Sequence, residues 1–359
     1  MRRTALLSLL LPLLLAADAQ EVASRDGANL QRPSWSADGS QLAYEANYHD
    51  RKVIELYVGD PEAGSFRRIT PSVRGGSSLT AGFSTSSAGQ VAHELSWAPA
   101  NIGRFVYSAT NEMSNYDLYL GGGGPLTQSP GADGGAAWSP DGNFIAFTSA
   151  RTGEGDVYLI DVRDVSAPPR RMTDFPTSSE LYVAWSPNST QLAFIAHSKS
   201  GDNLWLIPHL DASPVQLTTW SGTQTRPRFS PRGDRIAFYA NLEETGRFDL
   251  HIVAPREGAV PRRVVRGVVP NAGGPAWTPD GEHLVVVLSD SDRYDPIAVV
   301  PARSDATPEI LDLGTVNHGD LSVTAGSDGK IRLAYIAQGV RGDDVRDYRR
   351  LFVAETPVP

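Results

Sequence analysis

Ala137-Trp-Ser-Pro-Asp-Gly142 begins the stretch that decides the fold, because three short runs follow it in order: Ile145-Ala-Phe147, Val157-Tyr-Leu-Ile-Asp161 and Arg170-Arg-Met-Thr173. These runs are rich in β-branched and aromatic residues and are bounded by Gly, Pro, Asp and Ser, which is typical of strands joined by turns. The Asp-Gly pair supplies the positive φ angle of a tight hairpin. The stretch therefore predicts four short antiparallel strands.

The phrase around Trp138 recurs along the chain, and a fixed period indicates a repeat architecture. The other copies are Pro33-Ser-Trp35-Ser-Ala-Asp38-Gly39, Leu95-Ser-Trp97-Ala-Pro99, Ala184-Trp185-Ser-Pro187-Asn188, Arg228-Phe229-Ser-Pro231-Arg-Gly233-Asp234, Ala276-Trp277-Thr-Pro279-Asp280-Gly281 and the degenerate Leu321-Ser-Val323-Thr-Ala-Gly-Ser-Asp328-Gly329. The mean interval is about 48 residues. Four-stranded units that repeat in this way avoid exposed edges when they are arranged radially. We therefore predict an all-β fold, a single β-propeller of four-stranded blades, with seven blades favoured over six.

The ends of the chain predict how the ring closes. The last repeat contains three strand-like runs but no fourth, whereas about ten spare residues precede the first repeat. We expect Glu21-Val-Ala-Ser24 to supply the outer strand of the last blade. The alternative is a disordered N-terminal tail.

The first residues predict export. Met1-Arg2-Arg3 is basic, Ala5 to Leu15 is apolar apart from Ser8 and Pro12, and Ala17-Asp18-Ala19 has the small-x-small pattern of a cleavage site. This is the organisation of a secretory signal peptide. We predict a signal peptide over residues 1–19 that is cleaved after Ala19, a propeller domain over residues 20–359, and a periplasmic or secreted protein with no transmembrane segment after cleavage.

Composition removes several classes of function. The 359 residues contain no Cys, which excludes a disulfide framework, a thiolate metal site and a Cys nucleophile. Lys and Arg number 32 against 41 Asp and Glu, a net charge of −9, which argues against a general affinity for nucleic acid. We find no Gly-x-Ser-x-Gly elbow, zinc-protease helix or phosphate loop. No cofactor, bound metal or catalytic residue is therefore predicted.

The parts that do not repeat are the candidate binding surface, because loops on a rigid scaffold carry most binding sites. We expect one set of polar residues at the mouth of the central channel: His93, Glu94, Asp133, Glu180, Arg226, Asn271, His318 and Asp320. A second set belongs to loops on the same face: His49, Asp50, Arg51, His197 and Lys199. Mixed charges around a funnel suit a polar peptide, a glycan or a protein surface. The alternative reading is that these are solvated turns.

Two further features have a functional interpretation. His93 and His318, with Glu94 and Asp320, could form a metal or acid/base cluster in the channel, although isolated hydrogen-bonding histidines are the simpler reading. The long Ser/Gly-rich segment Pro71–Ala92 is interpreted as a mobile flap that contacts a partner, because loops of this length are usually functional or disordered.

The repeated phrase resembles the PD40 (WD40-like) repeats of TolB-type β-propellers, and the resemblance covers roughly residues 30–354. In TolB an α/β domain that contacts partners in the envelope-spanning Tol system precedes a six-bladed propeller, and we expect no such domain here. The resemblance implies an exported, non-catalytic protein-interaction scaffold of the bacterial envelope, monomeric, with an envelope protein as its partner. The alternative is a secreted propeller enzyme, or a glycan- or peptide-binding protein, that acts through the central funnel.

Overall fold

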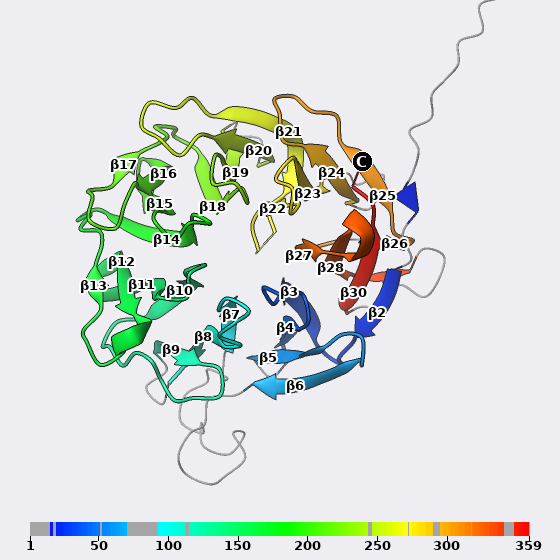
Figure 1. Ribbon diagram of the computed structural model, residues 1–359, viewed down its shortest axis with the longest axis horizontal. Coiled ribbons are helices and arrows are strands. Elements are labelled where there is room, and N and C mark those ends of the chain that lie inside the picture. The colour runs from blue at the N-terminus through cyan, green and yellow to red at the C-terminus, as the bar shows by residue number, and fades with distance from the viewer. Residues whose placement is uncertain are drawn as a thin grey trace, which may run out of the picture.

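The structure is a ring of β-sheets arranged radially around a central axis (Figure 1). It is a computed structural model, and it describes residues 15–16, 19–50, 52–69, 92–111, 115–242, 246–271, 273–289, 295–316, 318–340 and 348–358, without the side chains of residues 15, 16, 93 and 340. Within these ranges the only helical segments are the 3₁₀ turns η1 (Val162–Asp164) and η3 (Ser327–Gly329). The predicted all-β propeller is confirmed.

Each radial unit is an antiparallel meander whose first strand lies nearest the axis. In chain order the units are β3 (Asn29–Trp35), β4 (Leu42–Tyr48), β5 (Val53–Asp60) and β6 (Ser65–Ile69); β7 (Ala92–Trp97), β8 (Phe105–Thr110) and β9 (Tyr116–Leu120); β10 (Asp133–Trp138), β11 (Phe144–Thr152), β12 (Glu154–Asp161) and β13 (Arg170–Arg171); β14 (Ser178–Trp185), β15 (Leu192–Ser198), β16 (Gly201–Ile207) and β17 (Val215–Gln216); β18 (Thr223–Phe229), β19 (Ile236–Asn241), β20 (Phe248–Val253) and β21 (Arg262–Val269); β22 (Ala276–Trp277), β23 (His283–Leu288), β24 (Ile297–Pro301) and β25 (Glu309–Asp312); and β27 (Leu321–Ala325), β28 (Ile331–Ala337) and β30 (Arg350–Thr356). Short pairs are added by β1 (Leu15–Ala16) against β25 and by β26 (Thr315–Val316) against β29 (Gly339–Val340). Every copy of the repeated phrase thus lies on an innermost strand.

The ring closes through the N-terminal strand β2 (Ala19–Ala23), which pairs with β30 as the outer strand of the last unit. Gln20 lies opposite Val353 and Glu21 opposite Phe352. The expected closing strand is therefore confirmed, although it begins at Ala19, the last residue of the predicted signal peptide.

Three units depart from the pattern of a separate four-stranded sheet. The end of β21 pairs with β23, so the units of β18–β21 and β22–β25 share one hydrogen-bonded sheet. In the unit of β7–β9 a single bridge from Tyr119 to Pro125 stands in place of a fourth strand, since proline has no N–H to continue a ladder. With units joined in this way, the count of seven blades stays a prediction.

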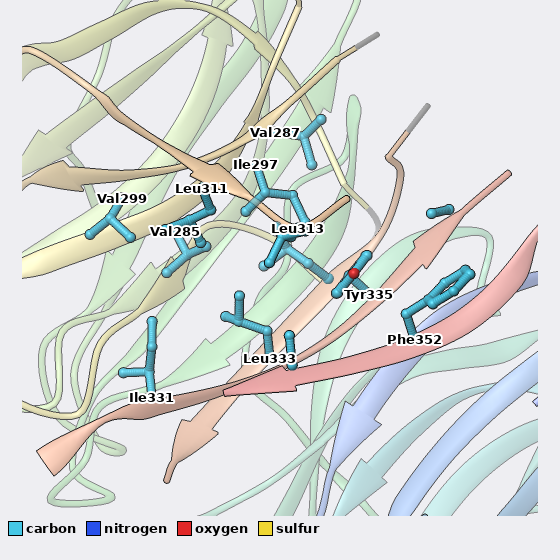
Figure 2. Close-up of a cluster of buried hydrophobic side chains, with 13 residues drawn as sticks. Val285, Val287, Ile297, Val299, Leu311, Leu313, Ile331, Leu333, Tyr335 and Phe352 are labelled. Carbon is cyan, nitrogen blue, oxygen red and sulfur yellow. The ribbon is translucent and has the colours of Figure 1, made fainter. Parts of the chain in front are cut away.

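The core lies between neighbouring units. In Figure 2, Val285, Ile297, Val299 and Leu311 of one unit face Leu333 and its neighbours of the next, and all are at most 3% exposed. Similar clusters fill other gaps between units. Each sheet is thus buried on both faces, which explains the near-continuous apolar bursts in the sequence.

The repeated tryptophans and turns hold the units together. Indole N–H groups donate to carbonyl groups of the preceding unit, from Trp97 to Ser34 at 3.1 Å and from Trp185 to Ala137 at 2.9 Å. In the following turn Ser139 donates to Asp141 at 2.6 Å and Gly142 has a φ of +80°. These residues therefore have a structural role, in which the indole N–H groups of Trp97 and Trp185 link neighbouring units.

Candidate functional site: the central channel

The innermost strands are interrupted by a β-bulge at the third position before the repeat aromatic. The strand register shifts there in β3, β7, β10, β14 and β18. The residue at the bulge has a positive φ angle in each case: Arg32 (50°), Glu94 (58°), Gly135 (60°), Tyr182 (59°) and Arg226 (56°). This conformation is uncommon for residues other than glycine. Bulges re-aim side chains and are frequent at functional sites.

These bulge residues line a cavity of 590 Å³ on the propeller axis, together with Arg228 and the repeat aromatics. The innermost strands surround this axis in Figure 1. The volume is within the range of about 300–1,000 Å³ that is typical of ligand pockets. In five units the bulge brings a different residue to the cavity. The lining of the cavity therefore varies although the strands repeat.

One side of the cavity carries carboxylates that are already engaged. Arg32 donates its backbone N–H to Asp320 at 2.9 Å, and its guanidinium lies 3.4 Å from Glu45 and 3.7 Å from Glu94. The backbone N–H of Glu94 donates to Glu45 at 2.8 Å, and that of Gly135 donates to Glu94 at 2.8 Å. Burial alone would lower the pKa of Arg32, but the three carboxylates raise it above its ordinary value. The carboxylates on this side are therefore held in place by Arg32 and by backbone N–H groups.

The opposite side carries two cations. The Arg226 guanidinium carbon lies 4.2 Å from the centre of the Tyr182 ring, a cation–π contact. Burial lowers the pKa of Arg226 and repulsion from Arg32 adds to this, whereas Tyr182 and, across the cavity, Glu94 and Asp320 oppose it. Burial also lowers the pKa of Arg228 to about 10, with repulsion from Arg226 as the second cause. Neither guanidinium forms an ion pair with a described residue. The carboxylates that act on Arg226 lie across the cavity and do not contact it directly.

The residues predicted for the channel mouth fall into two groups. Glu94, Arg226 and Asp320 come together around the cavity with Arg32. Asp133, Glu180, Asn271 and His318 are at most 6% exposed and lie inside the protein, which differs from the expected placement. His318, for example, contacts the Thr315 hydroxyl at 2.8 Å.

The remaining candidates are placed as follows. His49 and Asp50 are exposed after β4, and His197 and Lys199 are exposed around the β15–β16 hairpin. Arg51, the side chain of His93 and nearly all of Pro71–Ala92 lie outside the described residues. No group of three His, Cys, Asp or Glu side chains suited to a metal ion occurs in the described part of the chain.

Glu180 belongs to a link between units that is repeated at Gln224, five positions before the aromatic in each case. Val157 N–H donates to Thr173 at 2.8 Å, and the Thr173 hydroxyl donates to Glu180 of the next unit at 3.0 Å. In the following pair of units Thr218 donates in the same way to Gln224 at 2.6 Å. Asp133 occupies the corresponding position one unit earlier. Thr173 and Thr218, which come just after the fourth strands β13 and β17, thus join one sheet to the first strand of the next.

Arg32, Tyr182 and Arg228 were not anticipated as site residues. The sequence did contain one indication of the bulge. The third residue before the aromatic is glycine in two copies, Gly135 and Gly274, and both have positive φ. A position that accepts glycine, arginine and tyrosine alike is set by backbone conformation, and its side chain is free to vary.

The buried Glu180 predicts a pH-dependent stability. Burial raises its pKa to about 7, the nearby Asp156 adds to this, and the hydrogen bonds from Ser178 and Thr173 oppose it. Between the ordinary value of 4.5 and about 7, the folded state therefore holds a proton that the unfolded chain has released, so stability falls as pH rises.

We expect Glu180→Gln to remove this contribution, so that the urea midpoint of the wild type falls more steeply from pH 5 to pH 8 than that of the variant. Gln224 shows that glutamine fits the corresponding position in the next unit. Equal slopes for the two proteins would contradict the assignment.

The comparisons with known proteins concern the fold. No family model matches the chain. The Tol-Pal system protein TolB of Alcanivorax borkumensis is 31% identical over 106 residues, which cover 28% of this chain and 23% of that protein. The solved structure of "putative TolB" from Agrobacterium tumefaciens has a TM-score of 0.52 at 18% identity, covering 72% of this chain and 89% of that one. The oligogalacturonate lyase of Vibrio parahaemolyticus has a TM-score of 0.60 at 10% identity, covering 96% and 98%.

Radial four-stranded sheets around a channel define a β-propeller. More particularly, the chain has the fold of a TolB-like β-propeller. It spans less than half the length of the curated relatives that it matches. Because a lyase shares the fold, the fold alone does not separate a binding protein from an enzyme. None of the described helical segments is long and apolar enough to cross a membrane.

Proposed function

We propose that this chain is an exported, monomeric, non-catalytic TolB-like propeller that binds a protein of the bacterial envelope, and that the central channel is its main contact. The predicted signal peptide supports export to the periplasm or the exterior. The likeness to TolB supports an envelope partner. Nucleic acid is not proposed as a partner, in keeping with the net charge of −9.

The observation that carries this proposal is that the polar residues of the innermost strands have two different roles. Repeated polar groups bond one unit to the next, whereas the varied bulge residues face the cavity. The carboxylates beside the cavity accept hydrogen bonds from backbone N–H groups and from Arg32, which suits a rigid binding surface more than proton transfer. The exposed His49, Asp50, His197 and Lys199 are proposed as the rim of the same face, together with Arg51 and His93.

The test is capture of a partner by the immobilised chain starting at Gln20. We expect a specific protein from solubilised envelope to be retained, and we expect Arg226→Gln to weaken its binding at least about tenfold, as for a desolvated interface charge. Arg256→Gln removes the same charge from an exposed turn and should leave binding unchanged. If Arg226→Gln and Arg256→Gln retain the partner equally, the channel is not the contact. If the chain retains no specific protein, the proposed protein-binding role is wrong.

The alternative is an enzyme or a glycan- or peptide-binding protein that acts through the funnel. The cavity of 590 Å³ and the fold shared with a lyase favour it. Turnover or binding of a small substrate by the purified chain, lost on Arg226→Gln without any protein partner, would support this alternative.

A further inference from the structure

We infer that the Arg226–Arg228 side of the channel binds an oxyanionic group, a carboxylate or a phosphate, of the ligand. This inference rests on the proposed role of the channel in binding, and it names the chemistry that the site recognises. Three observations support it: the two guanidiniums form no ion pair, their surroundings fix their positions, and the site offers hydrogen-bond donors opposite a group of carboxylates.

The first observation is that these cations lack the carboxylate partners that several other arginines have, although Arg228 donates to the Pro227 carbonyl at 3.1 Å. In this acidic protein Arg68 lies 2.7 Å from Glu55, Arg151 lies 3.0 Å from Asp133, and Arg171 lies 2.7 Å from Asp156. Arg226 and Arg228 line the cavity and form no ion pair with any described residue. Withdrawing a cation from water without a counter-charge is costly. A bound anion would supply a counter-charge in direct contact with the guanidiniums.

The second observation is that the surroundings keep both guanidiniums in place. Arg226 lies over the Tyr182 ring, and both residues sit at bulges with positive φ. Arg228 lies against Gly274, where an added Cβ would come within 3.1 Å of its Cγ and 3.3 Å of its Nε. Glycine at this position leaves room for the arginine side chain. The geometry is therefore preorganised, which lowers the cost of binding.

The third observation concerns the donors and their direction. A guanidinium offers paired N–H groups that match two oxygens of a carboxylate or phosphate. Tyr182 forms no hydrogen bond within the described part of the chain, so its hydroxyl offers a further donor. Glu45, Glu94 and Asp320, across the cavity, would repel an anion. They would therefore direct it towards Arg226 and Arg228 and would orient a ligand that also carries a positive group.

The experiment is a thermal unfolding series on the chain starting at Gln20, with inorganic phosphate or succinate replacing sodium chloride at constant ionic strength. We expect one or both anions to raise the melting temperature of the wild type saturably, by about 2 °C at ten times Kd. Calorimetric titration then gives the Kd, and the tighter probe identifies phosphate or carboxylate as the preferred group.

Two variants and one control complete the test. Arg226→Gln should weaken the affinity at least about tenfold, and Tyr182→Phe, which keeps the ring, about threefold. Arg256→Gln should bind like the wild type. A wild type that shows no saturable binding of either anion, or an Arg226→Gln protein that binds as tightly, would overturn the inference.

The outcome is independent of the capture experiment. Anion binding that depends on Arg226, with partner capture that does not, would support the inference and contradict the channel as the protein contact. Capture that depends on Arg226, with no anion binding, would support the channel as the protein contact and contradict the inference.

Discussion

A chain that starts at Ser24 is expected to be less stable than the chain that starts at Gln20 by about 3 kcal/mol, because it loses the hydrogen-bonded closing strand. Residues Gln20, Glu21 and Ala23 pair with β30, and Val22 and Ala23 pack against a buried cluster that contains Leu351. Without them β30 becomes an exposed edge. The measurement is urea unfolding of the two chains under identical conditions.

A single substitution distinguishes the contribution of the strand β2 from that of its ion pair with β30. Glu21 forms an ion pair with Arg350, and its side chain is 34% exposed. Glu21→Ala keeps the strand and removes this partly exposed pair, so it should cost less than about 1 kcal/mol. If the truncated chain unfolds at the same urea concentration as the longer one, β2 does not close the ring in solution.

The sequence was sufficient to predict the strands and turns of this fold, because they depend on local chemistry. Closure was predictable because the last repeat contains three strand-like runs and spare residues precede the first repeat. Trp138 and its counterparts recur with a turn motif directly after them, and their spacing alone indicates the radial arrangement. The joining of β21 to β23 was not predictable, since it depends on how far two strands extend beside each other. Pro125 is a local signal against a fourth strand in its unit, because proline lacks the N–H group that a strand ladder needs.

The site was predicted only in part, because the β-bulge of the innermost strands changes which residues face the cavity. Simple alternation places the third and fifth residues before the aromatic on the same face of a strand. This is consistent with the prediction that Glu94, Arg226, Asp133 and Glu180 all lie at the channel mouth. The bulge inserts a residue between these positions, so the third residue lines the cavity and the fifth lies between the sheets. A one-residue change of register of this kind leaves little trace in a single sequence.

The largest effect of a single substitution is expected at Asp133. Its carboxylate is fully buried and accepts hydrogen bonds from Arg151 at 3.0 Å and from Ser129 at 3.2 Å. Asp133→Ala would leave the Arg151 guanidinium without its counter-charge against the rings of Phe147 and Tyr158. Breaking a buried pair from one side typically costs about 3–5 kcal/mol, and we expect a loss of this size in urea unfolding.

Two controls decide whether the loss comes from the unpaired charge. Asp161 and Arg163 form an exposed pair at 2.6 Å, and Asp161→Ala should leave the urea midpoint almost unchanged. Asp133→Ala combined with Arg151→Met removes both charges and should recover part of the stability, because the uncompensated cation is gone. If the double variant is as unstable as the sum of the single ones, the pair makes no specific contribution. The lost stability would then come from packing between the units.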